Sequence, residues 1–101
     1  MPTNNMRPIH PGEILQDELD MLDNMSSNRF AKHLAVPTNR ITHILNGTRS
    51  ITADTALRLA TFFGTQPEFW LNLQNAFDIK MTRKIAGKRI EKEVTQLHRA
   101  A

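Results

Sequence analysis

The sequence SNRFAKHLAVPTNRITHILN, residues 27–46, predicts two short helices joined by a tight turn. Each half carries apolar residues at helical spacing: Phe30, Ala31 and Leu34, then Ile41, Ile44 and Leu45. Pro37 cannot continue a helix because it lacks an N–H, but its fixed φ suits the first turn of a new one. We therefore expect one helix to end near Leu34 and the next to begin at Pro37 or Thr38, as in a helix-turn-helix motif.

The polar residues of the second expected helix favour a face that contacts DNA. They are Thr38, Asn39, Arg40, Thr42 and His43. All of them form hydrogen bonds, and the usual Glu/Lys pattern of a solvated helix is missing, so this face suits the edges of bases. Asn39 is the best candidate for a bidentate contact with adenine, and Arg40 is suited to either a guanine or a phosphate. The alternative is an ordinary solvated helix in a small bundle.

Four polar residues that flank this face are candidates for contacts with DNA phosphates: Ser27, Asn28, Asn46 and Arg49. Asn28 is expected at the start of the first helix, where free N–H groups favour an anion, although a plain capping role would place it there too. Arg49 follows the second helix in a short polar loop. It is either a phosphate clamp or a solvated loop charge.

Composition limits the classes of protein that this chain can belong to. A length of 101 residues supports one domain, and the lack of cysteine excludes disulfides and thiolate metal sites. No apolar run reaches the roughly 20 residues of a membrane span, and no signal sequence is recognisable. The four histidines have no metal-ligand spacing. We therefore expect a cytoplasmic protein that is not an enzyme and needs no cofactor or metal.

Three further stretches predict helices, which gives an all-α fold of five helices. Their expected buried residues are Ile14, Leu15, Leu19 and Leu22, then Ala56, Leu57, Leu59, Ala60 and Phe63, and finally Phe69, Trp70, Leu73, Ala76 and Phe77. Caps are expected from Ser26 or Ser27, from Thr52, and from a capping box over residues 65–68, with Gly47 and Gly64 ending helices. Apolar residues outside the main stripe of the fifth helix indicate either self-association or a terminal helix that is closely wrapped in the small core.

Charge is distributed unevenly, with a net −4 over residues 1–26, +2 over 27–79 and +5 over 80–101. This asymmetry indicates contact with a polyanion or acid–base pairing. We divide the chain into a flexible N-terminus (1–9), a helix-turn-helix domain (10–84) and a basic C-terminal tail (85–101). The tail is a short amphipathic helix from about Lys88, a segment that orders on binding, or a source of non-specific phosphate attraction.

Several tracts in fixed order resemble the HigA/VapI branch of the Xre-type, lambda-repressor-like helix-turn-helix proteins. They are His10-Pro11-Gly12-Glu13-Ile14-Leu15, Ile44-Leu45-Asn46-Gly47 with Arg49 and Ile51, Ala56-Leu57-Arg58-Leu59-Ala60, and Pro67-Glu68-Phe69-Trp70-Leu71-Asn72-Leu73-Gln74. The resemblance implies a five-helix DNA-binding domain that dimerises. The sequence differs from the family's usual residues at Asn28 and at Pro37-Thr38. These differences bear on which operator is read and not on the fold.

The resemblance also implies a role as the antitoxin of a type II toxin–antitoxin pair. The expected partners are then double-stranded operator DNA, a second copy of the chain and a RelE-like toxin that cleaves mRNA. A solitary repressor without a toxin is the alternative, because its DNA chemistry would be identical.

Overall fold

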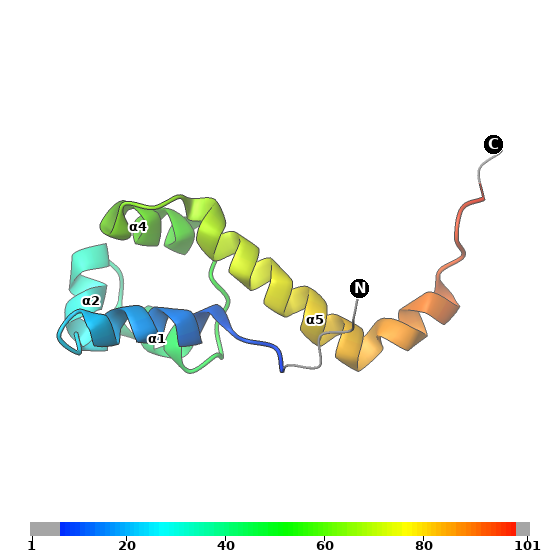
Figure 1. Ribbon diagram of the computed structural model, residues 1–101, viewed down its shortest axis with the longest axis horizontal. Helices are drawn as coiled ribbons and strands as arrows, with labels where there is room; N and C mark the ends of the chain where they lie inside the picture. The colour runs from blue at the N-terminus through cyan, green and yellow to red at the C-terminus, as the bar shows by residue number, and fades with distance from the viewer. Residues whose placement is uncertain (1–6, 99–101) are drawn as a thin grey trace.

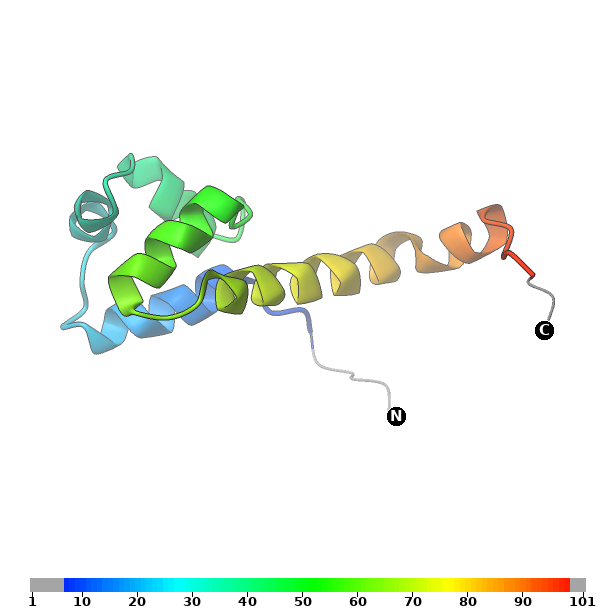
Figure 2. The ribbon, with the colours of Figure 1, turned by 90° about the horizontal axis from the view of Figure 1, so that it is seen from above.

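The computed structural model describes residues 7–98 and contains five helices and no strand in that range. In chain order the helices are α1 (Pro11–Met21), α2 (Ser27–Leu34), α3 (Thr38–Leu45), α4 (Ala53–Phe63) and α5 (Pro67–Glu93). The first four helices and the start of α5 form one group, from which the rest of α5 extends (Figures 1 and 2). The all-α, five-helix fold that the sequence predicts is confirmed.

Most of the expected helix ends are confirmed. The Ser26 hydroxyl accepts a hydrogen bond from the Arg29 N–H at 3.1 Å and caps α2. Thr52 caps α4, and Gly64 ends it with a φ of 70°. Gly47 follows α3 with a φ of 78°. Glycine adopts this left-handed conformation without the steric cost that a side chain would add.

The expected capping box at the start of α5 is wrong. Gln66 is the residue that precedes the helix, and no side chain caps it, although Pro67 does occupy the first turn. The reason is that Thr65 belongs to the end of α4, where its N–H bonds to the Ala60 carbonyl at 3.0 Å. Proline needs no partner for an N–H, so α5 starts without a side-chain cap.

A capping box is present instead at α1. The Nδ1 atom of His10 accepts a hydrogen bond from the Gly12 N–H at 2.9 Å, and the Glu13 carboxylate accepts one from the His10 N–H at 3.2 Å. His10 is buried, with its ring edge-to-face against Phe77 of α5 at 4.9 Å. Arg7 forms an ion pair with Glu13 at 2.6 Å, so this end of α1 is held by side chains from before the helix. Residues 1–6 of the expected flexible N-terminus lie outside the described part of the chain.

One cluster of buried apolar side chains joins the helices. Its members are Leu15, Leu19, Phe30, Ala31, Leu34, Ile41, Ile44, Ile51, Ala56, Leu59 and Trp70. Four residues expected in the core lie on the surface instead: Leu22, Leu57, Phe69 and Ala76. Leu22 does so because α1 has already ended at Met21. The core therefore depends on fewer residues of α1, α4 and α5 than the periodicity predicts.

Helices α1 and α3 approach each other closely at Gly12. A Cβ atom added to Gly12 would lie 1.9 Å from the carbonyl oxygen of Ile44, which is far inside van der Waals contact. Glycine is therefore required at this position for space, since only a residue without a side chain lets the two backbones meet. This contact fixes how deep the C-terminal end of α3 sits against α1.

A buried glutamine joins the segment after α3 to α5. Gln74 Oε1 accepts a hydrogen bond from the Ile51 N–H at 2.8 Å, and its Nε2 donates to Asp78 Oδ1 at 2.9 Å. Nε2 also lies 3.4 Å from the Ser50 hydroxyl. Since a buried N–H without a partner is costly, Gln74 stabilises the path of the chain between α3 and α4.

Helix α5 runs unbroken through Gly87 to Glu93, so the short separate helix considered from about Lys88 is the end of α5. Trp70 and Gln74 are its buried residues, and none from residue 75 to 98 is buried. At about 1.5 Å per residue its 27 residues account for much of the 55 Å length of the molecule. Figure 1 shows that α5 changes direction where its colour turns from yellow to orange.

We expect Gly12→Ala to lower the free energy of unfolding by about 3 kcal/mol or more, because the added methyl group forces α1 and α3 apart. Chemical denaturation followed by circular dichroism measures this. Gly87→Ala is the matched control: its Cβ would lie 3.6 Å from the nearest side-chain atom, that of Arg83. Alanine is a better helix former than glycine, so the free energy of unfolding of the control should rise by about 0.5–1 kcal/mol. Equal effects of the two substitutions would contradict the close contact.

Stability should fall as the pH is lowered from 7 to 5, because of His10. Burial lowers the pKa of His10 from its usual value of about 6.5, against the opposing effects of Asp78, a backbone hydrogen bond to Arg49, and Glu13. A lowered pKa means that the unfolded chain takes up the proton first. The contribution of neutral, buried His10 to the free energy of unfolding is therefore complete above about pH 6.5, and it is lost as the pH falls through the lowered pKa.

The measurement is unfolding in denaturant at a series of pH values, with His10→Asn as the comparison. Asparagine caps a helix but does not titrate in this range, so the variant should show a flatter pH dependence. Arg7 lowers the pKa of Glu13 to about 2, so its contribution is lost only at lower pH. A variant with the same slope between pH 7 and 5 would exclude His10 as the cause.

Candidate nucleic-acid interface

Helices α2 and α3 form the helix-turn-helix that the sequence predicts. Helix α2 ends at Leu34 and α3 begins at Thr38 after Pro37, as expected. Ala35 makes the turn with a φ of 57°, a left-handed conformation that costs about 1–2 kcal/mol for a residue with a side chain. A hydrogen bond of 3.1 Å from the Val36 N–H to the Ala31 carbonyl holds the turn.

One face of α3 is buried and the other is exposed. Ile41 and Ile44 are fully buried in the core, whereas Asn39, His43 and Asn46 are exposed and Thr42 is half-buried. Positions i, i+3, i+4 and i+7 of a helix share one face, so Asn39, Thr42, His43 and Asn46 form a single polar strip. The structure thus brings together three of the five expected base-reading residues.

Thr38 and Asn28 connect the first turns of α3 and α2. The Thr38 hydroxyl donates a hydrogen bond to Asn28 Oδ1 at 2.9 Å. Since this oxygen is the acceptor, the amide NH2 group of Asn28 is the part left to donate to another group. Ser27 is the first residue of α2 and is half-buried, beside the capping Ser26. The starts of the two helices therefore lie next to each other.

Arg40 differs from the rest of α3. Its Nη1 donates to Asp54 Oδ1 at 2.7 Å, and its side chain is only 26% exposed. Arg58 Nε donates to the same oxygen at 2.8 Å, and Arg58 Nη1 donates to the Leu34 carbonyl at 2.9 Å. Hydrogen bonds from Arg58 and, to a smaller extent, Arg40 lower the pKa of Asp54. The sequence predicts Asp54 only as a residue that suits the start of its helix, and it predicts no part in the interface for Asp54 or Arg58.

Arg49 lies exposed in the loop after α3. The loop is fixed by Thr48, whose backbone N–H and hydroxyl both donate to the His43 carbonyl, at 2.9 and 3.1 Å. Residues 24–53 contain Arg29, Lys32, Arg40 and Arg49 but no Asp or Glu. A segment with four cations and no carboxylate attracts a polyanion such as a phosphate backbone.

Two kinds of feature are absent from the described residues. Between residues 7 and 98 there is no cluster of three or more His, Cys, Asp or Glu side chains placed to hold a metal ion. None of the helices in that range is both long and apolar enough to cross a membrane. The side chains of His10 and Glu13 both take part in capping α1.

The fold and the exposed strip on α3 define a helix-turn-helix protein. Residues 19–70 match the helix-turn-helix family, and the chain belongs to the HigA/VapI-type, Xre-like members of this family. Virulence-associated protein I of Dichelobacter nodosus is 47% identical over 81 residues, which cover 80% of this chain and 75% of that protein.

Two solved structures extend the similarity to almost the whole fold. An addiction module antidote protein of the HigA family from Coxiella burnetii is 75% identical, with a TM-score of 0.88, and the match covers 91% of this chain and 100% of that one. Antitoxin HigA of Pseudomonas aeruginosa, solved with the higBA promoter, is 40% identical with a TM-score of 0.84, covering 91% and 100%.

Proposed function

We propose that this protein is a sequence-specific DNA-binding antitoxin that represses its own operon as a dimer and neutralises a RelE-like, mRNA-cleaving toxin. The observation that carries the proposal is the exposed polar strip of α3 in a segment without carboxylates. The promoter-bound structure of the P. aeruginosa relative supports it. Relatives are described as antitoxin, antidote, virulence-associated or helix-turn-helix transcriptional regulator proteins, which supports a regulatory role that is not enzymatic.

In this proposal α3 lies in the major groove and reads bases through Asn39, Thr42 and His43 of its exposed strip. Asn39 contacts an adenine through two hydrogen bonds, and Thr42 and His43 contact neighbouring base edges. Thr38 contacts a base edge at the start of the helix, where its hydroxyl also bonds to Asn28. The phosphates on either side are held by Ser27, Asn28, Asn46 and Arg49. This divides the interface into residues that specify sequence and residues that position the protein.

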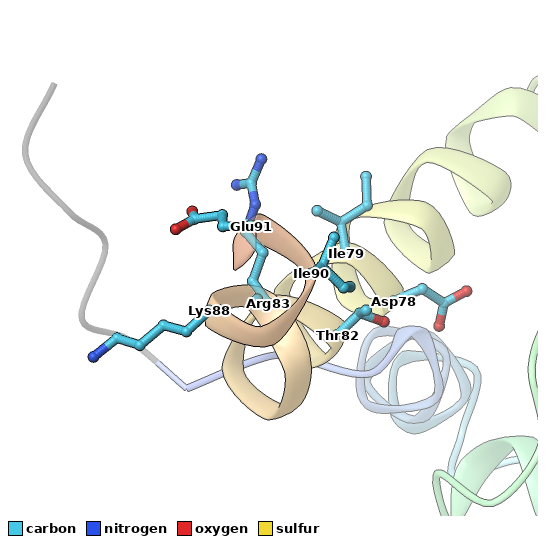
Figure 3. Close-up of a pocket in the computed structure, with 8 residues that line it drawn as sticks. Asp78, Ile79, Thr82, Arg83, Lys88, Ile90 and Glu91 are labelled. Carbon is cyan, nitrogen blue, oxygen red and sulfur yellow. The ribbon is translucent and has the colours of Figure 1, made fainter. Parts of the chain in front are cut away.

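A dimer would present two copies of α3 to successive major grooves, about 34 Å apart. The exposed part of α5 supports this assembly because it carries Ile79, Ile85 and Ile90, whose exposed fractions are 53%, 76% and 41%. A hollow of about 530 Å³ lies along this part of the helix. Figure 3 shows Ile79 and Ile90 on the same side of the bent helix, with Thr82 and Arg83 beside them.

The acidic surface of α1 is the proposed contact for a basic toxin. Asp17 and Asp20 are exposed on this helix and Glu18 is half-buried. RelE-like toxins act on RNA, so a basic surface is expected on them, and complementary charge speeds and orients association. The strip on α3 and the acidic part of α1 are made of different residues, so DNA and toxin do not compete for the same side chains in this proposal.

We expect Asn39→Ala to weaken binding to operator DNA by about 1–3 kcal/mol and to change binding to random DNA little, because it removes a contact with a base. Arg49→Ala should weaken both by a similar factor and reduce the salt dependence, because it removes a contact with a phosphate. Mobility-shift titrations at several salt concentrations, on DNA upstream of the gene and on a shuffled duplex, measure these effects.

Asn75→Ala is the control, since Asn75 is exposed on α5 and outside the proposed interface. Footprinting of the same DNA should show two half-sites one helical turn apart if the protein binds as a dimer. If Asn39→Ala loses affinity equally on both duplexes, Asn39 does not read a base.

We expect that co-expressing this protein with the product of the neighbouring reading frame yields a complex with a small basic protein. Cell growth that this product arrests when expressed alone should then be restored. We expect Asp17→Lys to reduce recovery of the complex by at least about tenfold and to retain operator binding, because a like charge then faces the toxin. Glu68→Lys, the same kind of charge change in the first turn of α5 and outside both the α1 surface and the proposed dimer surface, should retain both. Operator binding without any co-purifying protein would favour the solitary repressor.

A further inference from the structure

The guanidinium of Arg40 on α3 is held by a carboxylate of α4, and that carboxylate is held in turn by an arginine of its own helix. Asp54 Oδ1 accepts hydrogen bonds from both Arg40 and Arg58, at 2.7 and 2.8 Å. Arg58 in turn donates to the carbonyl of Leu34, the last residue of α2, at 2.9 Å. Asp54 lies in the first turn of α4, where a negative charge is also favoured by the helix dipole. These bonds connect α2, α3 and α4 and fix the side chain of Arg40 against α4.

The position of Arg40 on α3 agrees with this arrangement. Successive residues of an α-helix are rotated by about 100°, so Arg40 points about 100° away from Asn39. His43 and Asn46 lie within about 40° of Asn39 by the same geometry. Arg40 is therefore at the edge of the exposed strip, on the side of α4, and its half-buried side chain reflects that.

An arginine at this edge would contact phosphates if it were free. Its long side chain and several donors reach the DNA backbone easily, and such contacts add affinity for any sequence. Asp54 is the first carboxylate after the acid-free segment 24–53, so it lies where it reduces the positive charge of the interface. Asp54 thus both restrains the Arg40 side chain and offsets its positive charge.

We propose that Asp54 increases the selectivity of this protein for its operator by holding Arg40 against α4 and away from the DNA phosphates. The proposal rests on the DNA-binding function proposed above and names the residue that limits binding to other sequences. Base contacts fix the register on the operator, so a released Arg40 gains there only if a phosphate happens to be in reach. On random DNA the register is free, and a phosphate is always available.

The test compares the unmodified chain with Asp54→Asn, which keeps the shape and a hydrogen-bond acceptor but removes the charge. We expect affinity for a random duplex to rise by about 3- to 10-fold and the slope of log K against log salt to steepen by up to about 0.9, as for one added phosphate contact. Affinity for the operator should rise by no more than about twofold. Fluorescence anisotropy with labelled duplexes measures both, and thermal unfolding checks that the variant is folded.

Two further variants identify the cause. Arg40→Gln in the Asp54→Asn background should return random-DNA affinity to within about twofold of the unmodified chain, because the released cation is gone. Glu68→Gln removes the same charge from the first turn of α5, where, among the described residues, Glu68 forms no ion pair. It should change random-DNA affinity by less than about twofold.

The outcomes separate this proposal from the function on which it rests. If the unmodified chain binds operator and random DNA alike, or neither, the proposed function fails. If it selects the operator and Asp54→Asn gains equally on both duplexes, a general charge effect explains the result and the role of Asp54 is overturned. A loss confined to the operator also overturns it, since Arg40 would then read a base.

Discussion

The structure depends on the tertiary contacts that stabilise α3, a helix of eight residues. Helix α3 is too short to be stable by itself in water, because nucleating a helix is costly and few hydrogen bonds follow. Its conformation therefore comes from tertiary contacts on one side: Ile41 and Ile44 are buried, and Gly12 admits the α1 backbone to the end of the helix. Because these stabilising contacts lie on the inner face of α3, its outer face can carry polar residues that contact a binding partner.

The other elements support this arrangement at its two ends. At the start of α3, the bond between Thr38 and Asn28 places two helix starts together. At its end, Gln74 fixes the chain through the Ile51 N–H, and the buried His10 caps α1 beside Gly47. The same residues thus stabilise the fold and position the candidate interface, so changes in stability and changes in binding have to be measured separately for each variant.

The sequence predicts well what depends on neighbours along the chain. Pro37, Ser26, Thr52 and Gly64 mark the ends of helices by local chemistry, and these ends are confirmed. It does not predict what depends on residues far apart, such as the ion pair of Arg40 with Asp54 or the need for space at Gly12. Gly87 misled the reading of α5, because the cost of one glycine is small beside a run of strong helix formers such as Lys, Arg and Glu.

The two ends of α5 differ in how much of them is buried. Its first turns are anchored by Trp70 and Gln74, whereas its last turns have no buried residue. Amide protons in the two parts should therefore exchange with solvent at very different rates, because opening the far end exposes no buried side chain. A single continuous helix then contains two regions of local stability, and a partner that covers the far end would protect backbone groups that the monomer leaves open to water.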